Sequence, residues 1–150
     1  MKRLLISASL ILIGIIFISI QLYRYSVDSS LSDWHSQTEG FIKANLEQKH
    51  NGKPILLFFY TDWCSNCRAL REKVLTSSEV KKFLSHTIPV KINPETGRTE
   101  NELSNEFGVM GYPTLILISP SQSIVTLSNI NNNDPGQFLE IAKNALHSLI

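Results

Sequence analysis

The sequence predicts an α/β fold in which helices flank a central mixed β-sheet. Residues 54–60 (PILLFFY) form a short, continuous apolar run, which is typical of a central strand covered on both faces. Strand and helix signals then alternate along the chain, and two consecutive strand signals precede a last helix. Alternating strands and helices that lead into a hairpin indicate one sheet with both parallel and antiparallel pairs.

The first helix of the globular part is expected to begin near Ser32. Either Ser32 or Asp33 can cap a helix that continues to about Gln48, before Asn51 and Gly52 end it. The apolar stripe of this helix is expected to consist of Trp34, Phe41, Ile42 and Leu46.

The later elements have local signals of their own. A helix opens just after Trp63, Gly108 can end the next long helix, and Asp134 can cap the last one. The expected elements are a strand at residues 54–60, helices at 64–75 and 78–84, a strand at 87–93, a helix at 99–107, strands at 113–119 and 123–129, and a helix at 134–149.

The N-terminal residues 4–23 form an uncharged run that follows Lys2 and Arg3. At about 1.5 Å per residue, this run can cross a hydrocarbon core of about 30 Å. A cleaved signal peptide usually has a shorter apolar core of roughly 7–15 residues and a small-residue cleavage site, and residues 18–23 (ISIQLY) offer no such site. A buried core helix of this length would need a polar face. We therefore expect a transmembrane helix that acts as an uncleaved signal anchor.

This reading divides the chain into three parts. Residues 1–25 are the membrane anchor, the polar residues 26–31 are a tether, and residues 32–150 are one globular domain. The positive-inside rule keeps Lys2 and Arg3 in the cytoplasm. The protein is then expected to be a single-pass protein of a bacterial inner membrane, with its domain facing the periplasm or the cell exterior.

Charge gives no reason to expect a nucleic-acid partner. The formal net charge is +1, and the lysines and arginines are scattered among acids. Binding phosphates requires a concentrated basic face.

Cys64 and Cys67 are the two cysteines of the chain, and they are separated only by Ser65 and Asn66. Such a pair can be a redox centre, part of a metal site, or a structural disulfide. A zinc site usually needs four ligands, whereas the four histidines here are scattered without paired spacing, so no metal is expected. A structural disulfide that closes so short a loop would add little stability.

If the pair is a redox centre, the two cysteines are expected to have different roles. Cys64 is expected at a helix N-terminus, where unpaired N–H groups and the helix dipole favour a thiolate. Such sites lower the pKa of a cysteine from about 8.5 to between roughly 3.5 and 7.5. Cys64 is therefore the expected nucleophile, and Cys67, one turn further on, can attack the mixed disulfide and release the product. Trp63, directly before the pair, is expected to shield it.

The segment YTDWCSNC, followed about forty-five residues later by GYPT, resembles the thioredoxin superfamily. The resemblance implies the thioredoxin fold for residues 32–150, with Pro113 as a cis-proline facing the cysteines and Tyr112 on the wall of the substrate groove. Within the superfamily, residues 62–84 look most like the thioredoxin-like domains of membrane thiol:disulfide interchange proteins.

The chain departs from these patterns at two positions. Phe58 stands where thioredoxins commonly carry a buried aspartate that accepts the proton of the deeper thiol. Arg71 stands where the interchange domains tend to have an acid. The Ser65-Asn66 dipeptide lacks the histidine typical of strong oxidases, which favours a reductant.

Together these features predict a membrane-anchored, exported thiol:disulfide oxidoreductase that reduces protein disulfides through Cys64 and Cys67. Trp63, Tyr112 and Pro113 are expected to bind the partner protein, no cofactor is required, and a membrane electron donor is implied. A thiol oxidase or isomerase is the nearest alternative. A non-catalytic thioredoxin-like binding module or a thiol metallochaperone is an alternative of another class.

Overall fold

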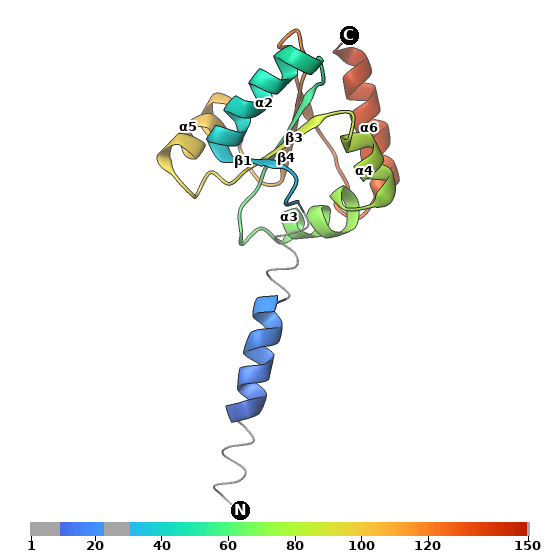
Figure 1. The fold of residues 1–150 in the computed structure, drawn as a ribbon. Helices are drawn as coiled ribbons and strands as arrows, with labels where there is room; N and C mark the ends of the chain where they lie inside the picture. The colour runs from blue at the N-terminus through green and yellow to red at the C-terminus, as the bar shows by residue number, and fades with distance from the viewer. Residues whose placement is uncertain (1–9, 23–30, 150) are drawn as a thin grey trace, which may run out of the picture. The chain divides into compact units, whose positions relative to one another are not determined.

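The computed structural model describes residues 10–22 and 31–149 (Figure 1). The chain divides into two compact units, Met1–Ser32 and Asp33–Ile150. Each unit is described here by itself.

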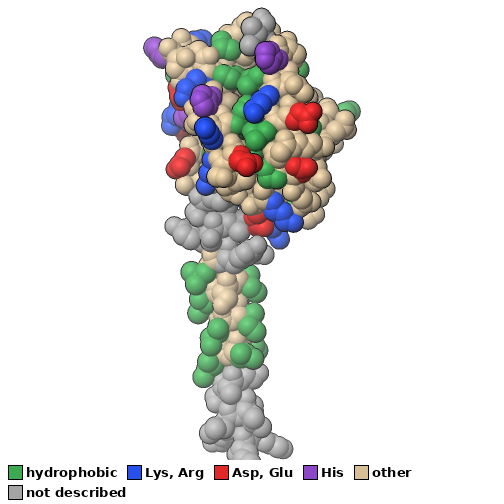
Figure 2. Space-filling view, turned by 90° about the vertical axis from the view of Figure 1, so that its right-hand side faces the viewer, with side chains coloured by type: hydrophobic (Ala, Val, Ile, Leu, Met, Phe, Trp, Pro, Cys, Tyr) green, Lys and Arg blue, Asp and Glu red, His purple; other side chains and the backbone are tan. Residues whose placement is uncertain are grey.

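In the first unit, residues 10–22 form an α-helix. Figure 2 shows hydrophobic side chains along both sides of it, and Leu10, Phe17 and Leu22 are each more than half exposed. Across residues 10–22 and 31–149, no helix combines the length and hydropathy that a membrane crossing requires. The predicted anchor also includes residues 1–9 and 23–25, and the tether includes residues 26–30, all of which lie outside the described residues. The anchor therefore stays a prediction.

The second unit is built on a five-stranded sheet with the order β1-β3-β2-β4-β5. Its central strand β2 pairs in parallel with β3 and antiparallel with β4. At the edges, β1 is parallel to β3 and β5 is antiparallel to β4. The strands are β1 (His35–Ser36), β2 (Ile55–Phe59), β3 (Ile88–Ile92), β4 (Thr114–Ile118) and β5 (Ile124–Leu127). The mixed sheet is confirmed, and Ile55–Phe59 of the PILLFFY run form its fully buried central strand.

Helices cover both faces of this sheet, with α2 and α5 on one face and α3, α4 and α6 on the other (Figure 1). The helices are α2 (Gln37–Asn51), α3 (Ser65–Leu70), α4 (Ser78–Leu84), α5 (Arg98–Glu106) and α6 (Pro135–Ser148), and α3 continues directly into the π-helical turn η1 (Arg71–Leu75). Because side chains alternate along a strand, β2 contributes to both cores. Leu57 and Phe59 pack in the cluster with Ala44 of α2 and Leu103 of α5, whereas Phe58 faces the other layer.

The start of the globular part differs from the prediction. His35–Ser36 is an edge strand, so the cap is neither Ser32 nor Asp33, and Ser36 is the N-cap of α2. A strand of two residues is too short to show alternation, and its pairing with β3 depends on residues more than fifty positions away. Trp34 precedes the strand and packs its ring edge-on against Phe58, with centroids 6.3 Å apart.

The buried face of α2 matches the predicted stripe only in part: Phe41 packs against the core, whereas Ile42 and Leu46 do not. Ile42 and Leu46 are 57% and 55% exposed, while Gly40, Ala44 and Gln48 are buried. These three residues follow one another at intervals of four, and the small side chains of the first two let the helix approach the sheet closely. The side-chain amide of Gln48 is satisfied in the core by the carbonyl oxygens of Lys53 and Ile118.

The other helix ends follow the predicted chemistry. Gly108 adopts the left-handed conformation, with φ of 64°, directly after the α5 cap Phe107. The carboxylate of Asp134 accepts the backbone N–H of Gln137 over 3.0 Å and thereby caps α6.

Candidate active site

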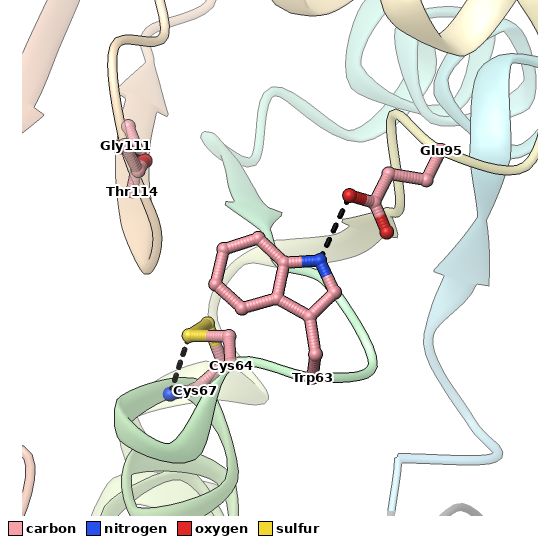
Figure 3. Close-up of a disulfide and its surroundings, with 6 residues drawn as sticks. All are labelled: Trp63, Cys64, Cys67, Glu95, Gly111 and Thr114. Carbon is pink, nitrogen blue, oxygen red and sulfur yellow. Dashed lines mark hydrogen bonds between the residues drawn. A yellow bond between two sulfur atoms is a disulfide. The ribbon is translucent and has the colours of Figure 1, made fainter.

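Cys64 lies at the end of the connection between the central strand β2 and helix α3. β2 ends at Phe59, and Cys64 is the N-cap residue of α3. The backbone N–H of Cys64 donates to the carbonyl oxygen of Thr61 over 3.3 Å, which fixes the turn. The Cys64 sulfur accepts the backbone N–H of Cys67 over 3.0 Å (Figure 3). The predicted helix-terminal position of Cys64 is confirmed.

Cys64 and Cys67 form a disulfide, with Cα atoms 5.2 Å apart. The two residues are 5% and 3% exposed, so both lie close under the surface. Between them Ser65 and Asn66 are exposed. The access of a partner sulfur to the pair is therefore limited, and access is one of the factors that set the rate of thiol exchange.

The loop before β4 carries the second predicted motif. The Tyr112–Pro113 peptide bond is cis, in agreement with the resemblance. The Thr114 hydroxyl donates to the carbonyl oxygen of Gly111 over 2.7 Å and closes the loop. Met110, two residues before Tyr112, is 98% exposed.

Trp63 connects this loop to the disulfide. Figure 3 shows its indole beside Cys64 and Cys67, and the ring meets Tyr112 edge-on with centroids 6.3 Å apart. The side chain is 68% exposed, so it flanks the pair without burying it. The structure therefore brings Trp63, Cys64, Cys67, Tyr112 and Pro113 to one region, while their roles in binding and catalysis remain predictions.

Glu95 was not singled out in the sequence, yet it belongs to this region. Its Oε1 atom accepts the indole Nε1–H of Trp63 over 2.8 Å. The available signal was an acid just after the strand expected at residues 87–93, because parallel neighbouring strands end at the same edge of a sheet.

Phe58 is surrounded by aromatic rings. It is 1% exposed, stacks on Tyr60 with centroids 5.4 Å apart and meets the edge of Trp34. At the position that commonly holds a buried aspartate in thioredoxins, this chain therefore has a buried aromatic ring in contact with the rings of Trp34 and Tyr60. Arg71 is half-buried at the start of η1.

No group of three or more His, Cys, Asp and Glu residues that could hold a metal ion occurs within residues 10–22 and 31–149. What the site contains is a disulfide at a helix N-terminus beside a cis-proline loop. In its disulfide form this pair can react with a partner thiol, and in its dithiol form it can react with a partner disulfide.

Comparison with known proteins assigns the fold to a family. A family model described as thioredoxin-like matches residues 33–120, which is more than half of the chain. The chain belongs to the thioredoxin-like family. The match includes both cysteines and the cis-proline loop of this thioredoxin-like domain.

Two curated relatives have names that describe disulfide chemistry. The disulfide bond reductase DsbH of Chlamydia pneumoniae is 36% identical over 92 residues, which are 55% of this chain and 55% of that protein. The thiol:disulfide interchange protein DsbD of Yersinia pestis is 26% identical over 95 residues, which are 62% of this chain but 16% of that protein. The chain thus matches about half of DsbH and a small part of DsbD.

Solved structures of similar proteins have the same fold as this thioredoxin-like domain. A DsbH oxidoreductase superposes with a TM-score of 0.62 at 28% identity, covering 76% of this chain and 83% of that one. The C-terminal domain of Neisseria meningitidis DsbD in the oxidised form gives a TM-score of 0.65 at 21% identity and covers 74% of this chain and 97% of that one. The predicted thioredoxin fold is confirmed.

Proposed function

We propose that the protein is an exported thiol:disulfide oxidoreductase that reduces disulfides of partner proteins. The observation that carries the proposal is the Cys64–Cys67 disulfide at the N-cap of α3, beside the cis Tyr112–Pro113 loop. The relatives named as a disulfide bond reductase and as a thiol:disulfide interchange protein support it.

The reaction begins with the reduced dithiol form. The thiolate of Cys64 attacks one sulfur of the partner disulfide, a Cys64–partner bond forms, and the other partner sulfur leaves as a thiolate and takes up a proton. Cys67 then loses its proton and attacks the sulfur of Cys64, the bond between Cys64 and the partner breaks, and the second partner sulfur leaves as a thiolate that takes up a proton. Two electrons have passed from the two cysteines to the partner, protons are exchanged through water, and the chain holds the Cys64–Cys67 disulfide.

Two features support reduction as the direction. The dipeptide Ser65-Asn66 lacks a histidine that would stabilise the reduced thiolate, and one relative is named a disulfide bond reductase. The partner backbone is expected to lie against Tyr112 and Pro113 as an added strand.

The experiment uses the full chain with insulin as the protein disulfide and dithiothreitol as the reductant. The wild type is expected to accelerate insulin precipitation over dithiothreitol alone, and Cys64→Ser is expected to abolish the acceleration. Cys67→Ala is expected to trap mixed disulfides with partner proteins in cells. A wild type no faster than dithiothreitol alone, together with no trapped partners, would overturn the proposal.

A redox titration of the Cys64–Cys67 pair tests the direction. Known reductants of this kind have potentials of about −270 mV and strong oxidants about −120 mV. A value near the first supports a reductase, and a value near the second assigns the protein to the oxidases.

We further propose that residues 1–25 anchor the domain in a bacterial inner membrane with the domain outside the cytoplasm, where a membrane electron donor reduces it again. The uncharged residues 4–23 behind Lys2 and Arg3 support this. The full chain is expected to stay with membranes after an alkaline carbonate wash, whereas a chain starting at residue 26 is expected to be released. Release of the full chain would contradict the anchor.

A further inference from the structure

The indole of Trp63 joins three loops at the disulfide. It precedes Cys64 in the β2–α3 loop, contacts Tyr112 in the loop before β4, and donates its N–H to Glu95 in the loop after β3. Figure 3 shows the ring between the disulfide and Glu95. Because 68% of the side chain is exposed, packing alone does not fix its orientation.

The loop that carries Glu95 is itself held firmly. The backbone N–H of Glu95 donates to the side-chain oxygen of Asn93 over 3.0 Å, and the backbone N–H and the hydroxyl of Thr96 both donate to the Asn93 carbonyl oxygen. Asn93 is only 2% exposed, and its own N–H donates to the Gln37 side chain over 3.0 Å. Glu95 is itself exposed, but its carboxylate is presented to Trp63 from a hydrogen-bonded turn that is anchored on the buried Asn93.

We propose that Glu95 is a positioning residue that orients Trp63 for recognition of the partner protein. This inference rests on the proposed function. A freely rotating indole must be ordered when a partner packs against it, and that ordering weakens binding. An acceptor that fixes the indole before binding removes this cost, so the hydrogen bond contributes to affinity and not to the sulfur chemistry.

Kinetics with the full chain and insulin test the proposal. Removing a hydrogen bond to a charged acceptor typically weakens an interaction enough that Glu95→Ala should raise KM about three- to tenfold, with kcat changed less than about twofold. Glu95→Gln keeps an acceptor oxygen and is expected to restore most of the loss. Glu106→Ala removes an exposed acid from the end of α5 and is the matched control.

A double-mutant cycle tests whether Glu95 acts through the indole. Trp63→Phe keeps an aromatic ring but cannot donate, so it should raise KM as Glu95→Ala does. The double variant should be no worse than Trp63→Phe alone, because both changes remove one interaction.

A spectroscopic readout separates positioning from a general structural effect. The two tryptophans of the chain give two indole N–H resonances, and Trp63→Phe identifies the one from Trp63. Glu95→Ala is expected to shift that resonance upfield and speed its exchange with water, leaving Trp34 unchanged. Glu95→Gln is expected to retain slower exchange.

The inference is overturned by an unchanged KM in Glu95→Ala, by a Glu95→Gln variant as impaired as Glu95→Ala, or by additive effects in the cycle. The second result would mean that the charge of Glu95 acts on the partner directly. A wild type that does not reduce insulin overturns the proposed function and this inference with it, whereas an active wild type with unaffected Glu95 variants overturns this inference alone.

Discussion

The backbone N–H of Cys67 donates a hydrogen bond to the sulfur of Cys64 over 3.0 Å. The two cysteines are therefore not equivalent, because the Cys64 sulfur receives a donor from the first turn of α3. A donor at this position stabilises a sulfur anion more than a neutral thiol. In the reduced protein, Cys64 should be the sulfur that carries negative charge at neutral pH.

Cys64 is accordingly predicted to be alkylated first. With the single-thiol variants Cys67→Ala and Cys64→Ala, iodoacetamide at about pH 7 should modify Cys64 about tenfold faster than Cys67, since the thiolate is the reactive form. Mass spectrometry of timed samples measures both rates. Equal rates, or faster modification of Cys67, would remove the basis for naming Cys64 the nucleophile.

Phe58 is predicted to be a major contributor to stability. The ring is 1% exposed and packs on Trp34 and Tyr60, so Phe58→Ala should lower the free energy of unfolding by about 3–5 kcal/mol. Phe58→Leu keeps most of the volume but loses the ring contacts and should cost about 1–2 kcal/mol. Urea denaturation gives both values.

A substitution of Phe58 also tests whether the ring affects the reaction in addition to packing in the core. Phe58 carries no ionisable group, so Phe58→Leu should change insulin reduction less than about twofold at a temperature where the variant is folded. A large loss of activity in folded Phe58→Leu would show that the ring acts on the disulfide and is more than part of the core.

The sequence was sufficient for the central sheet and the cysteine pair because their signals are local. The PILLFFY run, the helix that begins at Cys64 and the cap Asp134 each depend on neighbouring residues. The cis bond before Pro113 required a family resemblance, since a proline at the start of a strand has an ordinary explanation.

What the sequence did not reveal depends on distant partners. Glu95 reaches Trp63 across 32 positions, and its place just after a strand does not by itself identify Trp63 as its partner. Strand β1 exists because His35 and Ser36 pair with β3. The buried line of α2 was missed for a related reason: close approach to the sheet favoured Gly40 and Ala44 over the larger Ile42 and Leu46.

Gly40 gives this close approach a test. In a helix, replacing glycine by alanine ordinarily stabilises by about 1 kcal/mol. Here the added Cβ would lie 2.9 Å from the carbonyl carbon of His35 and 3.1 Å from its Cβ. Gly40→Ala should therefore lower the free energy of unfolding, by about 1–2 kcal/mol after the helix gain is subtracted. The measurement is urea denaturation. A stabilised Gly40→Ala variant would contradict the tight contact between α2 and β1.

Glu100 is predicted to make the stability of the domain sensitive to acid. Hydrogen bonds from its own backbone N–H and from Thr38 hold the pKa of Glu100 below the ordinary 4.5, although partial burial opposes them. The unfolded chain then binds this proton at a higher pH than the folded chain does. The contribution is thus fully present above about pH 5 and is lost as the pH falls through the folded pKa.

Glu100→Gln should be less stable than the wild type at about pH 7, and the difference should shrink by about pH 3. Urea denaturation at several pH values measures this, with Glu79→Gln on the exposed face of α4 as the control. If the difference in stability between the wild type and Glu100→Gln stays constant over this pH range, the ionisation of Glu100 does not contribute to the stability of the domain.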